Sequence, residues 1–348
     1  MKIGFTTFAT AFQQRGGLEV QIRATQAALR QLGVDVNIVD LPNDRLSNYN
    51  IIHHFSKSQE GFRVIEAASK LGCATVFSPL IPFVDTQIEA LKIKLVCYTL
   101  HKTLGRDFMT RWDTYTEGIK KADLVCALTN RERSTITRLV PEAGPKVRVV
   151  PNGIGQEFFM ASEIKFGEKY GMRGDFVLSA SSIEPNKNIL RTVRAAKAEG
   201  YRVVLVGSIG DEAYYNRCLV EGGDNVRYVG EMPYPSSLLT SAYAAAGAVV
   251  LASFSEAFGL VPFEALAAGT PSILTNASGV DTPTSLPWFQ RVAPDDDQGL
   301  RRAIRIAMEA PRDRESCRAL VQDMSWSSVS KKLLGLYEEL MRREGGRI

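Results

Sequence analysis

The chain has 348 residues, of which 45% are hydrophobic and 23% are charged. This length suits about two domains. The composition is ordinary for a folded globular protein and excludes a disordered chain, a collagen-like fibre and a small disulfide scaffold. The longest apolar runs are far shorter than the ~20 residues that span a bilayer. The N-terminal segment turns polar too soon for a signal peptide.

The net charge of +4 conceals an uneven distribution. Residues 1–150 carry a net charge of +6, residues 151–299 carry −6, and residues 300–348 carry +4. A basic first half beside an acidic second half suggests two domains that face different partners. The alternative is a solvated surface whose charge distribution has no functional role, and charge alone does not exclude it.

Short apolar runs that read as buried strands alternate with amphipathic segments along the first half of the chain. Strands are predicted at 2–8, 34–39, 51–54, 74–77, 124–128 and 146–150, and helices at 19–32 and 60–70.

The segment 88–122 reads as two further helices, separated by a break at Gly105. Residues 92–138 hold ten basic and five acidic side chains, which is most of the excess charge of the first half. A basic helix with aromatic residues suits an anionic membrane surface or an anionic acceptor. A solvated helical cover on the sheet is an equally good interpretation, because the apolar face must pack somewhere in either case.

The second half repeats the alternation after a polar, Gly-bearing linker at 151–174. Strands are predicted at 176–180, 202–206, 226–229, 248–251 and 272–274, and helices at 189–199, 235–245, 259–268 and 327–343. Strands that alternate with helices indicate βαβ units and parallel sheets. The sequence therefore predicts an α/β protein with two doubly wound, Rossmann-like domains.

The most informative segment is 255–271, where a predicted strand feeds a loop that opens a helix. Gly259 allows the backbone to approach a ligand closely. The N–H groups near Phe258, Gly259 and Leu260 would point at an anion and gain from the helix dipole. Glu256 and Glu264 flank this point, and carboxylates suit paired sugar hydroxyls. The segment predicts a nucleotide-sugar site; the alternative is a helix N-cap region in which Glu256 complements the helix dipole and Glu264 is solvated.

Glu256 and Glu264 form an E-x7-E pattern followed by Ala-Leu-Ala-Ala-Gly-Thr-Pro, which resembles the retaining GT-B glycosyltransferases of the family 4 type, or glycosyl transferases group 1. Other motifs agree in order and spacing, and the resemblance covers nearly the whole chain. They are Gly-Gly-Leu-Glu at 16–19, Pro-Asn-Gly at 151–153, Glu-Pro-Asn-Lys-Asn at 184–188, Val-Gly-Glu at 229–231 and Ser-Trp at 325–326.

The resemblance implies a GT-B architecture with a deep interdomain cleft. Residues 1–155 would form the acceptor-binding domain and 156–325 the donor-binding domain, and the helix in 326–348 would return to the first domain.

The same resemblance implies roles for single residues. Lys187 and Glu256 would be catalytic: Lys187 would neutralise the donor diphosphate, whose charge grows in the transition state, and Glu256 would contact hydroxyls of the donor sugar. Glu264 would hold the nucleotide ribose. The amides of Phe258, Gly259 and Leu260 would bind the diphosphate.

The chain departs from the family pattern at two positions near Lys187. Ser182 stands where relatives often carry a basic residue, and Asn186 stands where related sequences often carry Arg. With Ser182 and Asn186 at these positions, the donor site as a whole holds one fewer cation than is usual in the family. Another basic residue would compensate, or Lys187 and backbone N–H groups would hold the diphosphate alone.

Gly16 and Gly17 would contact the donor diphosphate or the acceptor, although a flexible turn is the plain alternative. His54, at a strand end, and His101, in a helical stretch, are candidates for the acceptor side. With three histidines, five cysteines and no C-x-x-C spacing, the chain predicts no metal site and free thiols in a reducing compartment.

Together these features predict a hexosyltransferase that uses a UDP- or GDP-sugar, retains the anomeric configuration and needs no cofactor. The expected partners are the nucleotide-sugar donor, a carbohydrate or lipid-linked acceptor and an anionic membrane surface at 92–138, with no nucleic acid. The expected setting is polysaccharide, glycolipid or cell-envelope glycan synthesis in the cytoplasm, with peripheral attachment to the inner membrane face. The alternatives are a GT-B sugar-nucleotide epimerase and a non-catalytic sugar-nucleotide-binding protein.

Overall fold

Two parallel sheets organise the chain in the computed structural model, which describes residues 1–13, 16–56, 61–105, 108–281 and 285–344. Each sheet is the centre of one compact unit. Unit 1 comprises 1–153, 279–281 and 326–348, and unit 2 comprises 154–278 and 282–325.

The sheet of unit 1 has six parallel strands in the order β2-β1-β3-β4-β5-β6. The strands are β1 (Lys2–Thr6), β2 (Asp35–Ile38), β3 (Ile51–Phe55), β4 (Ala74–Ser78), β5 (Leu124–Ala127) and β6 (Val147–Val149). The helices are α1 (Gly17–Gln31), α2 (Gly61–Lys70), α3 (Gln87–Leu104), α4 (Arg111–Lys121), α5 (Asn130–Leu139) and α14 (Trp326–Glu344).

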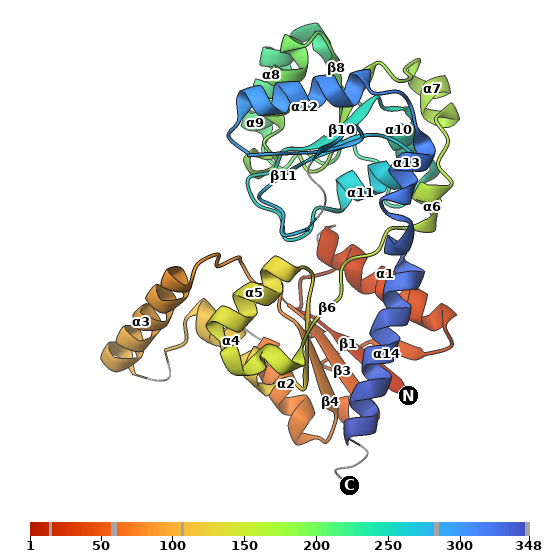
Figure 1. The fold of residues 1–348 in the computed structure, drawn as a ribbon. Coiled ribbons are helices and arrows are strands. Elements are labelled where there is room, and N and C mark those ends of the chain that lie inside the picture. Colours follow the sequence, from red (N-terminus) through yellow and green to blue (C-terminus); the bar gives the residue numbers. More distant parts are fainter. Residues whose placement is uncertain (14–15, 57–60, 106–107, 282–284, 345–348) are drawn as a thin grey trace. The chain divides into compact units, whose positions relative to one another are not determined.

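The helices of unit 1 cover both faces of its sheet. Figure 1 shows α14 lying beside α1 on one face. There the α14 side chains Val329, Leu333, Tyr337 and Leu340 join a buried cluster with residues of α1, β1 and β3. On the other face α2, α4 and α5 pack against β4 and β5. The C-terminal helix thus completes the core of the N-terminal unit.

The sheet of unit 2 has the order β12-β13-β11-β10-β7-β8-β9, and only β12 is antiparallel to its neighbour among the described strands. The strands are β7 (Phe176–Ala180), β8 (Arg202–Val206), β9 (Val226–Tyr228), β10 (Ala248–Leu251), β11 (Ser272–Thr275), β12 (Ser285–Leu286) and β13 (Phe289–Val292). The helices are α6 (Gln156–Phe159), α7 (Ile164–Tyr170), α8 (Ile189–Ala198), α9 (Glu212–Gly222), α10 (Ser237–Ala245), α11 (Leu260–Ala267), α12 (Asp297–Glu309) and α13 (Arg314–Ala319).

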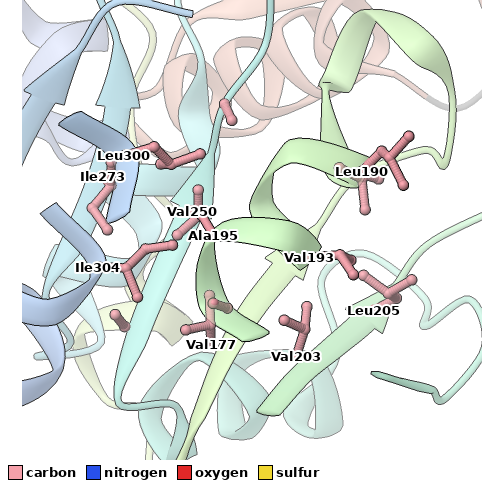
Figure 2. Packing of buried hydrophobic residues seen from close by; sticks show 14 of the residues in the cluster. Val177, Leu190, Val193, Ala195, Val203, Leu205, Val250, Ile273, Leu300 and Ile304 are labelled. Carbon is pink, nitrogen blue, oxygen red and sulfur yellow. The ribbon is translucent and has the colours of Figure 1, made fainter. Parts of the chain in front are cut away.

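A continuous apolar core lies between this sheet and helices α8, α9 and α12. Figure 2 shows Val177, Val203 and Val250 on the strands facing Val193 of α8 and Ile304 of α12. Such strands are buried on both faces, which is why their sequences read as unbroken apolar runs. The predicted α/β class with two doubly wound units is confirmed.

Some local expectations differ from the structure. The predicted linker at 151–174 contains the short helices α6 and α7, which are too short to give a clear apolar period.

No helix among the described residues is both long and apolar enough to cross a bilayer. All five cysteines are buried and unpaired.

Candidate functional site

Lys187 and Glu256 meet at the carboxyl ends of two adjacent strands in unit 2. Lys187 ends a short turn after β7, and Glu256 lies in the loop after β10. Lys187 Nζ donates to Glu256 Oε1 at 2.6 Å, and the two side chains are 20% and 14% exposed. Ligands of parallel α/β sheets bind at this edge, so the pair lies where a substrate would be expected.

Two neighbours hold the Glu256 carboxylate and its loop. Ser253 Oγ donates to the same Oε1 atom at 2.8 Å. Glu256 also forms a parallel β-bridge with Ser278, whose Oγ donates to the Phe258 carbonyl at 2.6 Å. The carboxylate is therefore oriented from its own loop and braced from the loop after β11.

The turn that carries Lys187 is clamped to the loop that carries Glu256. The Phe254 N–H donates to the Asn186 carbonyl at 2.9 Å. Asn188 Nδ2 donates to the carbonyls of Ala252 at 3.1 Å and Pro294 at 2.9 Å. Asn188 takes a left-handed conformation with φ of 54°, which Asn tolerates better than most residues. One buried amide thus ties together the ends of β7, β10 and β13.

The start of α11 lies directly after this loop. Gly259 has φ of 82°, and a Cβ there would lie 3.2 Å from Leu251 Cδ2 and 3.3 Å from Leu274 Cδ1, so a larger residue would be strained. No side-chain cap is present among the described residues, which leaves the first-turn amides near Leu260 suited to an anion. Phe258 is buried beneath the turn and packs on Phe263.

Glu264 is buried, with only 2% exposure. Its Oε1 accepts from Tyr234 Oη at 2.7 Å, and its Oε2 accepts from Tyr243 Oη at 2.9 Å. Burial raises the pKa of Glu264 to about 7, although both hydrogen bonds act in the opposite direction. The resemblance assigns this carboxylate to the nucleotide ribose; in the structure it is enclosed by two phenol groups.

The two departures from the family pattern can now be located. Asn186 is exposed, and its Nδ2 donates to the Ser255 carbonyl at 3.3 Å, so it contributes to the clamp. Ser182 is half-buried. Arg291 of β13 donates through Nη2 to the carbonyls of Thr275 at 3.2 Å and Ser278 at 3.1 Å. The Arg291 guanidinium therefore stabilises the loop after β11, and this loop holds Glu256 through Ser278.

Gly16 and Gly17 lie in unit 1, where Gly17 opens α1 and Gly16 is extended with φ of −176°. A Cβ at either position would meet no atom of the described chain within 4 Å. Packing against the described residues therefore does not explain the Gly pair, and a ligand contact and a flexible turn both stay open.

The two candidate histidines occupy different settings in unit 1. His54 is 1% exposed on β3, its Nδ1 lies 2.9 Å from Thr6 Oγ1, and burial lowers its pKa to about 3. Its Nε2 has no partner within the described ranges. His101 Nε2 lies 3.0 Å from Asp113 Oδ2, so it ties α3 to the start of α4.

The sequence-based prediction missed several residues around the site. Ser253 was detectable because it lies three residues before Glu256, and Asn188 because it follows Lys187. Tyr234 and Tyr243 gave no signal, because their approach to Glu264 depends on tertiary packing. Among the described residues, no three His, Cys, Asp or Glu side chains gather as a metal site would require.

Comparison with known proteins shows a family match within unit 2 and several relatives. Residues 161–322 match the family model described as Glycosyl transferases group 1. The D-inositol 3-phosphate glycosyltransferase of Kribbella flavida is 31% identical over 183 residues, which cover 47% of this chain and 43% of that protein. The protein of the same name from Saccharomonospora viridis is 29% identical over 286 residues, which cover 75% and 65%. The chain thus spans less than two thirds of these relatives.

Solved structures share the fold over the whole chain. Sucrose-phosphate synthase from Thermosynechococcus elongatus superimposes with a TM-score of 0.76 at 20% identity, covering 99% of this chain and all of that one. A UDP-forming trehalose-phosphate synthase from Burkholderia xenovorans gives a TM-score of 0.62 at 15% identity, covering 90% and 77%. The chain therefore has the two-domain α/β architecture of GT-B glycosyltransferases, and residues 161–322 of its second unit are similar to the Glycosyl transferases group 1 model.

Proposed function

We propose that the protein is a hexosyltransferase that moves a sugar from a UDP- or GDP-sugar to an acceptor hydroxyl with retention of anomeric configuration. One observation carries the proposal: the 2.6 Å pair of Lys187 Nζ and Glu256 Oε1 beside the uncapped start of α11. A cation and free amides suit a diphosphate. A carboxylate suits sugar hydroxyls.

The chemistry assigns a separate task to each member of the pair. When the bond between the anomeric carbon and the phosphate oxygen breaks, negative charge grows on the diphosphate. Lys187 would stabilise that charge, and Glu256, released from Lys187, would accept from sugar hydroxyls. The acceptor proton would pass to an oxygen of the leaving diphosphate, so the reaction needs neither a protein base nor a cofactor.

The remaining donor contacts follow from the same placement. The amides of Phe258, Gly259 and Leu260 would bind the diphosphate, with Ser182 and Asn186 at its edge. Each carboxylate oxygen can accept about two hydrogen bonds. Because each Glu264 oxygen receives one from a tyrosine, a ribose hydroxyl would have to share the carboxylate with Tyr234 and Tyr243.

The acceptor would bind on unit 1, with Gly16 and Gly17 reaching the donor diphosphate or the acceptor, and His54 and His101 on the acceptor side. We propose a carbohydrate or lipid-linked acceptor in polysaccharide, glycolipid or envelope glycan synthesis. Two relatives support a hydroxyl acceptor: the D-inositol 3-phosphate glycosyltransferase named above, and the O-antigen chain mannosyltransferase B of Escherichia coli, which is 26% identical over 64% of this chain. The site of action would be the cytoplasm, at the inner membrane face.

The direct test is a panel of UDP- and GDP-sugars measured by thermal shift and by product analysis. A binder raises the unfolding temperature by mass action, and NMR of the product reports the anomeric configuration. Hydrolysis or transfer with retention supports the proposal. Inversion at C2 of the donor sugar would identify an epimerase, and binding without turnover a sugar-nucleotide-binding protein.

A further inference from the structure

Helix α3 has two apolar faces, and only one of them is packed. Ala90 and Cys97 are buried on the inner face. On the opposite side Ile88, Leu91, Leu95 and Tyr98 are 66%, 56%, 64% and 64% exposed. Their spacing of three, four and three residues places them in one continuous stripe. We call these four residues the outer stripe.

The outer stripe belongs to a well-anchored helix. Thr86 and Glu89 form a capping box at the start of α3. His101 Nε2 lies 3.0 Å from Asp113 Oδ2 of α4, and Lys94 Nζ donates to the Arg138 carbonyl at 3.1 Å. Figure 1 shows α3 at the outer edge of unit 1, beyond α4 and opposite α14. The exposure is thus a property of an ordered element and not of a frayed end.

The charges on α3 select the kind of partner. Lys92 and Lys102 are exposed, and Lys102 follows Tyr98 by one turn on the outer stripe. The single carboxylate of the helix, Glu89, accepts from the N–H groups of Asp85 and Thr86. An apolar stripe with lysines and no competing acid matches an anionic lipid surface, in which apolar side chains enter the acyl boundary and cations meet headgroups.

We propose that the outer stripe docks unit 1 on an anionic membrane surface. A second copy of the chain fits less well, because a two-fold pairing about the middle of the stripe would bring the Lys92 side chains of both copies together. Docking deepens the proposed function, since it would bring the protein to lipid-linked acceptors. The biological purpose of docking rests on the proposed function. The docking contact itself does not, because it involves no catalytic residue.

The test is flotation of the full chain with vesicles of phosphatidylglycerol or of phosphatidylcholine. The protein should float with the anionic vesicles and be released by salt, which screens the lysine contribution. Leu91→Gln with Leu95→Gln should reduce the bound fraction at least about fivefold, because the apolar contact is lost. Lys92→Glu with Lys102→Glu should abolish the preference for anionic lipid.

Matched controls place equivalent changes elsewhere on the surface. Met160→Gln with Val220→Gln alters side chains that are 72% and 82% exposed in unit 2. Lys331→Glu with Lys332→Glu alters two exposed lysines of α14. Both double variants should float like the unaltered protein. In a Tyr98→Trp variant, the tryptophan emission that the substitution adds to the spectrum of the unaltered protein should shift to the blue with anionic vesicles only. This shift reports on α3 directly.

Three results would overturn the docking proposal. They are no flotation of the unaltered protein on anionic vesicles, equal flotation of the α3 variants, and an α3-dependent dimer in sedimentation equilibrium. The thermal shift with nucleotide sugars separates this inference from the proposed function. The α3 variants should keep that shift, so lost docking with retained donor binding leaves the donor site intact.

Discussion

At the residue scale, the central feature is that the two proposed catalytic groups neutralise each other before any ligand arrives. Lys187 and Glu256 share one short contact, and Ser253 adds a second donor to the same carboxylate oxygen. In the proposed reaction an incoming diphosphate would compete with Glu256 for the ammonium group. The displaced carboxylate would then accept from the sugar hydroxyls, so donor binding and alignment would be one event.

Substitutions at this pair should affect turnover far more than folding. Lys187→Ala and Glu256→Gln should each reduce kcat by roughly 10²–10³-fold, the usual loss when a preorganised charge is removed. Steady-state kinetics and circular dichroism measure the two effects. Lys197→Ala and Glu309→Gln, which alter exposed charges on α8 and α12, should leave kcat unchanged. Near-normal rates in both site variants would contradict the assignment.

Glu264 predicts a pH-dependent stability. Its pKa is raised from 4.5 to about 7, so its contribution to the free energy of unfolding is complete below pH 4.5 and is lost as the pH rises through 7. That change amounts to ~3 kcal/mol. Urea unfolding at pH 5 and pH 8 should show this loss, and Glu264→Gln should remove it.

Glu132 in unit 1 supplies the control for this measurement. Burial also raises its pKa to about 7, so Glu132→Gln should remove a separate part of the same pH dependence. If the free energy of unfolding of Glu264→Gln depends on pH in the same way as that of the unaltered protein, the Glu264 carboxyl is not the titrating group.

At the element scale, the predicted strands illustrate what a single sequence can reveal. All eleven predicted strands are present, because buried parallel strands leave continuous apolar runs. The antiparallel pair β12 and β13 was not predicted, since β13 (Phe-Gln-Arg-Val) has two polar residues at its centre and β12 has only two residues. Short edge elements of this kind are stabilised by pairing, which a local pattern does not record.

The site shows the same division between local and tertiary information. Glu256 and Gly259 were predicted together because their spacing within one βα loop is fixed, and Lys187 was predicted from the family resemblance of the Glu-Pro-Asn-Lys-Asn motif. The clamp through Asn188 and the enclosure of Glu264 by two tyrosines were not predicted. Both contacts join segments that are far apart in the sequence, so the spacing of residues in a local motif does not predict them.

The β7–α8 turn offers a test of how the clamp works. Asn188→Ala removes the two amide hydrogen bonds and places an alanine at positive φ, whereas Asn188→Gly removes only the hydrogen bonds. The free energy of unfolding should therefore be highest for the unaltered protein, lower for Asn188→Gly and lowest for Asn188→Ala, with steps of about 1–2 kcal/mol. Urea denaturation measures this order. If Asn188→Ala is more stable than Asn188→Gly, backbone strain at this turn is negligible.

At the scale of the whole molecule, the chain leaves unit 1, builds unit 2 and returns to unit 1 through α14. The basic first half of the sequence forms unit 1, and the acidic segment forms most of unit 2. The net charge of +4 is thus the sum of two oppositely charged bodies. The stability of unit 1 depends on residues that are distant in sequence from its first strands, as the His53–Tyr337 hydrogen bond of 2.6 Å illustrates.

A core substitution in α14 should therefore loosen the N-terminal strands and leave unit 2 unchanged. Leu333 is 2% exposed, and Leu333→Ala should cost about 2–5 kcal/mol. Hydrogen exchange should accelerate in β1 and β3, while β7 and the thermal shift with nucleotide sugar stay as before. Lys332→Ala, at an exposed neighbouring position, is the control. Faster exchange confined to β7 would contradict this division.

The two passages of the chain at the border of unit 2 lie side by side. Ile154 forms a parallel β-bridge with Ser325, and its N–H donates to the Met324 carbonyl at 2.7 Å. Apart from residues 279–281, unit 2 is one uninterrupted stretch whose ends are adjacent, the geometry that tolerates domain insertion. The segment 154–325 can therefore be treated as an exchangeable cassette. A chimera that exchanges it for the equivalent stretch of a relative would reveal which body sets donor choice and which sets acceptor choice.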